Sequence, residues 1–289
     1  MKTVQEQIME RQNSEEMLKC QYVARYFFNS AERTGYIWLF FCLLSVLFVL
    51  LPVPKTEFLK QIHTLAPYIL QVIILVSYYI ICSKISKASM IRNYYDSVVL
   101  GFDELKDHDN RNKIQEIVMD VSRRKSEECS VQIRNTGKDD PMGVKDWYTF
   151  PPVFSDAVFE CQKQNQWWDR KLTRARLIIE FIALLAGIVI FFLVLVFNVV
   201  TPGRAALCGI GFLSTFFESI FENYKYIQKS KQIDNDCKML EESRLRNQLV
   251  LLQKHINERR EIKIAGFDFL HKLMNPRITE DYEKGSSIL

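Results

Sequence analysis

The stretch Asn165–Leu185, NQWWDRKLTRARLIIEFIALL, orders its residue types along the chain rather than around a helix. Two tryptophans come first, four basic residues follow, and a long apolar run begins after them. A helix on the surface of a soluble protein would instead repeat apolar positions every three to four residues. The order aromatic, basic, apolar is typical of a helix that passes from water through the interface of a bilayer. This segment therefore predicts the start of a membrane-spanning helix.

Apolar residues gather in four runs that contain no Lys, Arg, Asp or Glu, although the overall composition, 48% hydrophobic and 25% charged, is ordinary for a globular protein. The runs cover residues 34–54, 61–83, 181–203 and 205–217. A helix needs about 20 apolar residues to cross a bilayer, so the first three runs are long enough. The fourth is long enough only if the two glutamates after it lie near its end. The alternative for each run is a buried core helix of a soluble protein.

The distribution of Lys and Arg near the ends of these runs predicts their orientation. Twelve basic residues lie on one side: Arg25, Arg33, Lys84, Lys87, Arg92, Arg170, Lys171, Arg174, Arg176, Lys225, Lys229 and Lys231. Three lie on the other side: Lys55, Lys60 and Arg204. Because basic residues stay on the cytoplasmic side, both termini and the long central segment are expected there. The predicted location is a membrane, crossed several times.

The predicted fold is an all-α membrane protein with four transmembrane helices in two hairpins and a mainly helical cytoplasmic domain. The N-terminus, the central loop and the C-terminus form that domain. The expected divisions are a cytoplasmic amphipathic helix (1–33), hairpin 1 (34–84), a cytoplasmic helical region (85–176), hairpin 2 (177–224) and a cytoplasmic C-terminal helical region (225–289).

Helical periodicity continues outside the apolar runs. One apolar stripe follows the second run, with Ile91, Tyr95, Val98 and Phe102 at steps of three and four residues. After the fourth run, two apolar seams out of phase predict a long helix that breaks near residues 242–243. The segment CSVQIRN, residues 129–135, is compatible with a short strand. Glycines and prolines concentrate in residues 135–152, which predicts a loop.

Motifs for catalysis and metal binding are missing from the sequence. The four histidines are far apart, and there is no phosphate-binding loop, nucleophile elbow or zinc motif. We therefore expect no enzymatic activity, no cofactor and no metal, and DNA binding is not expected either.

Polar residues inside the predicted spans are the candidates for lining a pore. They are Gln71, Ser77, Glu180, Glu218 and Glu222. A charge at the centre of a span costs roughly 2.5–3.5 kcal/mol on insertion scales. The glutamates either extend to the cytoplasmic interface and pair with nearby basic residues, or form an acidic ring in a cation-selective pore. Conduction would require a homo-oligomer, since one subunit has too few polar residues in its spans. For Gln71 the alternative is an interhelical hydrogen bond.

Two segments resemble a known family. They are ERQNSEEMLKCQYVARYFFNSAER, residues 10–33, and KDWYTFPPVFSDAVFECQKQNQWWDRKLTRAR, residues 145–176. Their order and their positions before the first and third runs resemble the SMODS-associated four-transmembrane (S-4TM) effector family. Thr149 departs from the family pattern, in which a proline follows the DWY tyrosine. The positions that match are Arg11, Gln12, Asn13, Asp146, Trp147, Tyr148, Cys161, Gln162, Asn165, Trp168 and Asp169.

The resemblance implies a pore-forming or membrane-disrupting effector of bacterial antiphage defence, located in the bacterial inner membrane. A nucleotidyltransferase would make a cyclic nucleotide upon infection, and the effector would respond by arresting or killing the cell. The partners implied are the lipid bilayer, further copies of the chain and a cyclic oligonucleotide. Two other functions stay open: a constitutive channel or transporter, and a non-conducting membrane-anchored scaffold.

The matching positions have two interpretations. They form either a packed cytoplasmic subdomain, with Arg11 and Asp169 as partners, or a ligand pocket that uses arginines on phosphate and aromatic stacking. The residues concerned are Arg11, Asn13, Asp146, Trp147, Tyr148, Gln162, Asn165, Trp168, Asp169 and Arg170.

Overall fold

The computed structural model describes residues 2–48, 54–102, 110–150, 156–196, 202–242 and 245–263. The side chains of residues 46, 167–176, 180, 191, 194, 195, 202, 204, 205, 207 and 208 lie outside the description. Within these ranges the protein is helical, as predicted, and contains no strand beyond an isolated bridge between Thr136 and Lys145. The helices are α1 (Val4–Gln12), α2 (Glu15–Phe48), α3 (Glu57–Leu100), α4 (Arg111–Arg124), α5 (Ser126–Arg134), α6 (Ala157–Val196), α7 (Pro202–Glu242) and α8 (Arg246–Glu261).

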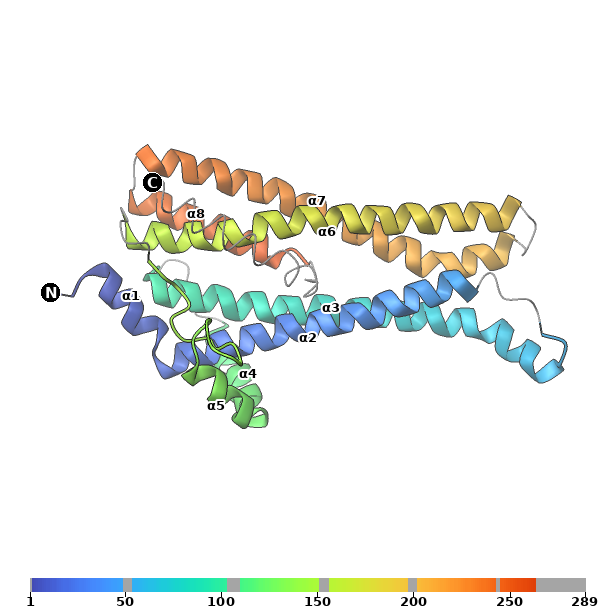
Figure 1. Ribbon diagram of the computed structural model, residues 1–289, viewed down its shortest axis with the longest axis horizontal. Helices are drawn as coiled ribbons and strands as arrows, with labels where there is room; N and C mark the ends of the chain where they lie inside the picture. The colour runs from blue at the N-terminus through green and yellow to red at the C-terminus, as the bar shows by residue number, and fades with distance from the viewer. Residues whose placement is uncertain are drawn as a thin grey trace.

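Four long helices run side by side and give the molecule its elongated shape (Figure 1). Helix α2 packs along α3, and α6 packs along α7, so each pair forms a hairpin. At 1.5 Å per residue, the 44 residues of α3 extend about 66 Å, about twice the thickness of a bilayer's hydrocarbon core. Long helices therefore run through the whole molecule.

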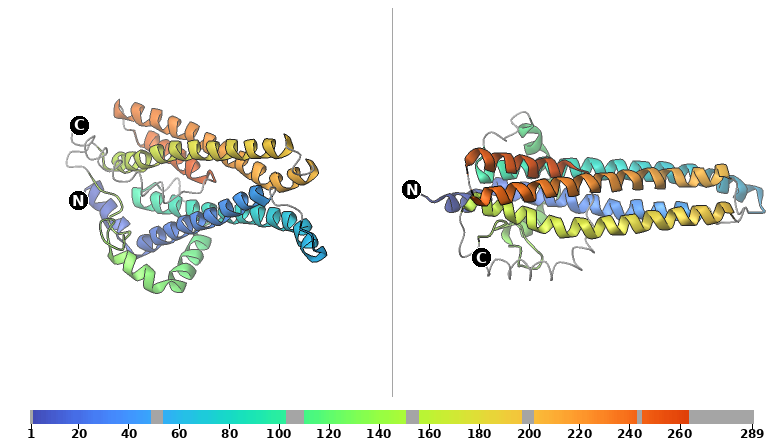
Figure 2. Two further views of the ribbon diagram at one scale, coloured as in Figure 1. Left: turned by 45° about the vertical axis from the view of Figure 1, so that its right-hand side comes forward. Right: turned by 90° about the horizontal axis from the view of Figure 1, so that it is seen from above.

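The two ends of the bundle differ. We call the end that contains both α1 and α8 the head (residues 2–33, 85–102, 110–150, 156–176 and 225–263). The other end is the shaft (residues 34–48, 54–84, 177–196 and 202–224). In Figure 2, α4 and α5 project from the long helices at the head, and only long helices form the shaft. The shorter helices are therefore confined to one end.

Helix α3 is, within the described ranges, the helix that is long and apolar enough to cross a bilayer. Helix α6 contains a shorter apolar stretch, Leu177–Ile190. The shaft also exposes large apolar side chains on all four helices, including Phe40 (60%), Val72 (60%), Ile182 (59%) and Phe217 (56%). Apolar surface of this extent is typical of an interface with a membrane or another protein. The other three spans and the orientation stay predictions.

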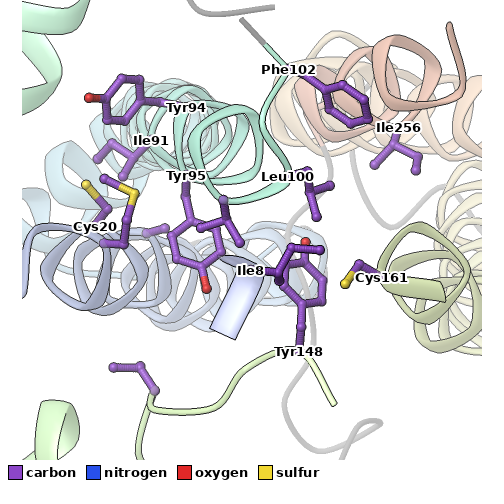
Figure 3. Close-up of a cluster of buried hydrophobic side chains, with 14 of the residues drawn as sticks. Ile8, Cys20, Ile91, Tyr94, Tyr95, Leu100, Phe102, Tyr148, Cys161 and Ile256 are labelled. Atoms are coloured by element: carbon purple, nitrogen blue, oxygen red, sulfur yellow. The ribbon is translucent and has the colours of Figure 1, made fainter. Parts of the chain in front are cut away.

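The head and the shaft each have a hydrophobic core of their own. The shaft core contains Trp38, Ile74, Phe212 and Phe216, with the rings of Trp38 and Phe216 stacked at 4.9 Å between centroids. The head core draws on all eight of the helices named above and on the loop after α5. Figure 3 shows Ile8, Tyr148 and Cys161 close together where α1, this loop and α6 meet. The head is thus assembled from segments far apart in the sequence.

Local sequence signals explain several helix ends. Thr3 caps α1 with a reciprocal capping box to Glu6. Helix α3 ends at Leu100, and the next residue, Gly101, has a φ of +75°, in the left-handed region that glycine adopts without strain. The predicted break after α7 is present, since α7 ends at Glu242 and α8 begins at Arg246. A further break separates α1 from α2 at residues 13–14, which apolar periodicity did not indicate.

The compatibility of CSVQIRN with a strand was misleading, because residues 129–134 belong to α5. Glu127 and Glu128 precede this segment in the first turn of α5, where acidic side chains stabilise a helix through its dipole. Cys129 is buried in the head core. Local charge and packing therefore outweigh the β-branched residues of the segment.

Candidate functional site: a buried polar network in the head

A fully buried carboxylate, that of Asp96 on α3, is the centre of a polar network in the head. One oxygen, Oδ1, accepts a hydrogen bond from the Tyr148 hydroxyl at 2.7 Å and lies 3.4 Å from Nη2 of Arg92. The other, Oδ2, accepts from Nη1 of Arg260 at 2.5 Å and from Nε2 of Gln253 at 3.3 Å. An isolated buried charge would be very costly, whereas here both oxygens have donors.

The two arginines keep Asp96 ionised. Burial alone would raise its pKa, but the positive charges of Arg260 and Arg92 outweigh burial, and the pKa lies below its ordinary value. Arg92 reaches the carboxylate from one helical turn away on α3, while Arg260 comes from α8. The ion pair therefore fastens α8 to α3.

Tyr148, the tyrosine of the DWY segment, is also fully buried. Its hydroxyl donates to Asp96 and accepts from Nδ2 of Asn165 on α6 at 2.9 Å. Burial, and then the negative charge of Asp96, raise the pKa of Tyr148 well above its ordinary value, so the hydroxyl keeps its proton. One phenol thus joins α3 to α6.

The RQN and DWY segments pair directly with each other. The Gln12 amide accepts from the backbone N–H of Tyr148 at 2.9 Å and donates to its carbonyl at 3.2 Å. The Asn13 amide donates to the Asp146 carboxylate at 2.7 Å and accepts from its backbone N–H at 3.1 Å. Asp146 adopts a φ of +53°, a backbone conformation uncommon for residues other than glycine. The side chains of α1's end therefore set the conformation of this loop.

Arg11 contacts α3 and its own helix. Its guanidinium donates to the carbonyl of Val99 at 3.5 Å and to the side chain of Gln7 at 3.4 Å. The side chain of Asp169 lies outside the description, as do those of Trp168 and Arg170, so pairing of Arg11 with Asp169 stays a prediction.

Trp147 lies against two arginines. The guanidinium of Arg92 is 4.7 Å from the centre of the Trp147 ring, and that of Arg25 is 5.8 Å from it. Arg25 also donates to the carbonyls of Met142 and Gly143 at 3.1 and 3.0 Å. Burial, and then the Arg92 charge, lower the pKa of Arg25 to about 10. These contacts hold the loop against α2.

Helix α8 links the two hairpins through amide hydrogen bonds. Gln162 on α6 donates to the Leu249 carbonyl at 2.9 Å and to Oε1 of Gln253 at 3.2 Å. The fully buried Arg259 donates to Oε1 of Gln166, and Gln166 donates to the Ser230 carbonyl on α7 at 2.9 Å. Since Arg260 next to it holds Asp96 on α3, α8 contacts helices of both hairpins.

Sequence reasoning missed the residues at the centre of this network: Asp96, Gln253, Arg259 and Arg260. An Arg–Asp pair four residues apart beside an apolar stripe was the one signal that pointed to Arg92 and Asp96. The structure brings Arg11, Asn13, Asp146, Trp147, Tyr148, Gln162 and Asn165 into the head, where their contacts pack one segment against another. Among the described residues, no group of His, Cys, Asp and Glu side chains is arranged to hold a metal.

The candidate pore residues are not gathered in one place. Gln71 lies in the shaft interior, where it donates to Oγ of Ser45 at 2.9 Å and accepts from the backbone N–H of Gly211 at 2.6 Å. This is the interhelical hydrogen bond expected as its alternative role. Ser77 is also buried.

The acidic candidates lie on α6 and α7. Glu222 pairs with Lys225 at 2.6 Å, as expected for a glutamate at the membrane interface, and Glu218 is exposed on the surface of α7. The side chain of Glu180 on α6 lies outside the description. Whether these glutamates line a path for ions stays a prediction.

Comparison with known proteins gives one match that covers nearly the whole chain. The family model of the SMODS-associating 4TM effector domain matches residues 6–287, including both segments that pair in the head. No curated protein and no solved structure matches the chain. The extent of the family match shows that this chain belongs to the SMODS-associating 4TM effector family, a family of membrane effectors associated with antiphage defence.

Proposed function

We propose that this protein permeabilises the bacterial inner membrane when its head receives a cyclic-nucleotide signal made by an associated nucleotidyltransferase. The result for an infected cell is growth arrest or death. The observation that carries the proposal is the ion pair between Asp96 and Arg260 in the head. Asp96 lies on α3, which belongs to one hairpin, and Arg260 lies on α8, which contacts helices of both hairpins.

The long helices supply a route from the head to the shaft. Helix α3 runs from Glu57 to Leu100 and α7 from Pro202 to Glu242 without interruption. A signal that moves α8 relative to α3 would therefore move the shaft ends of both hairpins. A ligand shifts such a balance only by its differential affinity for the two states. A 100-fold preference corresponds to about 2.7 kcal/mol, which a few charge-assisted hydrogen bonds to phosphate supply.

In this proposal the shaft is embedded in the bilayer as four spans, and the head and both termini lie in the cytoplasm. The apolar surface of the shaft and the distribution of basic residues support this arrangement. The interior of one shaft is filled by side chains such as Phe212 and Phe216. Permeation therefore uses several copies of the chain or a general disruption of the bilayer, and it requires no catalysis.

The test is dye release from liposomes that contain the purified full chain, with and without the product of the nucleotidyltransferase. We expect release only with the product, and no release when a catalytically inactive nucleotidyltransferase supplies the reaction mixture. Equal release in both conditions would identify a constitutive channel. No release in either, despite insertion verified by flotation, would favour the non-conducting scaffold.

A further inference from the structure

A pocket of about 380 Å³ opens between α7 and the end of α8, where the shaft meets the head. It is lined by Phe221, Tyr224, Lys225, Gln228, Lys229, Gln232, Glu258 and Ile262. Phe217, Phe221 and Tyr224 are each more than half exposed and form an apolar strip that leads along α7 into the pocket. The pocket is thus continuous with the apolar surface of the shaft and ends among polar side chains.

Two lysines and one glutamate line the pocket, and each lysine pairs with a glutamate, one of which, Glu222, lies beside the pocket. The Lys225 ammonium lies 2.6 Å from Glu222 and 4.4 Å from the centre of the Phe221 ring. The Lys229 ammonium lies 2.5 Å from Glu258. The hydrogen bond with Lys229 lowers the pKa of Glu258, so this carboxylate is ionised at neutral pH. Two positive and two negative groups at separate positions complement a zwitterion better than an anion.

We propose that this pocket binds the headgroup of a zwitterionic aminophospholipid from the cytoplasmic leaflet. The phosphate lies toward Lys225 and Lys229, and the primary ammonium donates hydrogen bonds to Glu258. The acyl chains follow the apolar strip of α7. This inference rests on the proposed insertion of the shaft into the bilayer, since that insertion brings the pocket to the level of lipid headgroups.

The chemistry of the headgroup makes the proposal selective. Phosphatidylethanolamine carries a phosphate and an ammonium with N–H donors. Phosphatidylcholine has a quaternary ammonium without N–H donors and cannot hydrogen-bond to Glu258. Phosphatidylglycerol is anionic and has no positive group to interact favourably with Glu222 and Glu258. We expect the full chain to prefer phosphatidylethanolamine roughly tenfold over either, the effect of one charge-assisted hydrogen bond.

The experiment is a titration of the delipidated full chain in detergent with each of the three lipids, followed by native mass spectrometry. Glycerophosphoethanolamine, the headgroup without acyl chains, is a fourth probe. We expect it to bind far more weakly, because it lacks the chains that cover the apolar strip. Equal affinity for all three lipids, or headgroup binding as tight as that of the whole lipid, overturns the proposal.

Three variants complete the test. Lys229→Met removes the phosphate donor and should weaken binding of both phosphatidylethanolamine and phosphatidylglycerol. Glu258→Gln removes the ammonium acceptor and one negative charge, so the preference should move toward phosphatidylglycerol. Lys231→Met is the matched control, since Lys231 is exposed on the same helix and does not line the pocket.

Gel filtration and circular dichroism check that each variant folds. If Lys229→Met misfolds, Lys225→Met takes its place. Unchanged affinity for phosphatidylethanolamine in the folded lysine variant, or unchanged lipid preference in folded Glu258→Gln, overturns the proposal. Flotation with liposomes separates this outcome from failure of the proposed function, because a chain that floats and releases dye but shows no lipid preference contradicts only the headgroup site.

Discussion

Replacing Asp96 with Asn tests whether the ion pair in the head holds α8 in place. The substitution keeps the shape of the side chain but removes the negative charge that Arg92 and Arg260 face. It also replaces one acceptor oxygen with an amide N–H₂, which cannot accept the hydrogen bonds that the neighbouring side chains donate to Asp96. Because Asp96 is fully buried, Asp96→Asn leaves two positive groups without their counter-charge in the interior.

The expected loss follows from the burial of the pair. Removing one partner of a buried, hydrogen-bonded ion pair costs about 3–5 kcal/mol. Since the lost contacts fasten α8, this loss should appear as easier local opening of that helix. A loss of about 3 kcal/mol corresponds to more than a hundredfold faster hydrogen exchange of the α8 amides. We also expect dye release from liposomes without any nucleotide signal.

Asp120→Asn is the matched control. Asp120 pairs with Arg124 at 2.5 Å on the surface of α4, with side chains 46% and 65% exposed, and such exposed pairs contribute about 0–1 kcal/mol. Hydrogen–deuterium exchange measured by mass spectrometry compares the two variants. If α8 exchanges no faster in Asp96→Asn than in Asp120→Asn, the ion pair does not hold α8 and the proposed coupling loses its basis.

The pKa of Asp96 adds a pH dependence with a definite sign. Its pKa in the folded protein lies below the unfolded value of about 3.9, so its contribution to stability is complete above that value. The contribution is lost as the pH falls through the folded-state pKa. Protection of α8 should therefore be constant around neutral pH and fall in acid in the wild type. An equally steep fall in Asp96→Asn would assign the acid response to other groups.

Two further predictions concern the shaft. Gly211→Ala should destabilise the shaft by about 1–3 kcal/mol, because the new Cβ would lie 2.1 Å from Oε1 of Gln71. Gly203→Ala is the control: no atom lies within 4 Å of its new Cβ, so thermal unfolding in detergent should stay almost unchanged. Similar melting of both variants would contradict this packing. If Glu218 and Glu222 face the axis of an oligomeric pore, replacing both with Gln should reduce cation preference in bilayer recordings. Unchanged selectivity with normal expression would assign both residues to the membrane interface.

Some features of this protein followed from the sequence because they depend on neighbours along the chain. The apolar runs and their spacing predicted long helices, and α3 is long and apolar enough to span a bilayer. The break after Glu242 also followed, because a shift in the phase of an apolar seam is a local signal. The segment 129–135 was misleading because its local β propensity favours a strand, whereas the helix dipole and burial favour the helix that forms.

The partners of the polar residues were decided only by the tertiary structure. Gln12 and Tyr148 are 136 positions apart, and Asp96 and Arg260 are 164 apart. No periodicity relates such positions, because their meeting depends on how α1, α3 and α8 pack in three dimensions. Family resemblance indicated that the RQN and DWY segments matter, but not that they bind each other. A buried amide or carboxylate must find donors and acceptors wherever packing brings them, and that requirement is met in space rather than along the chain.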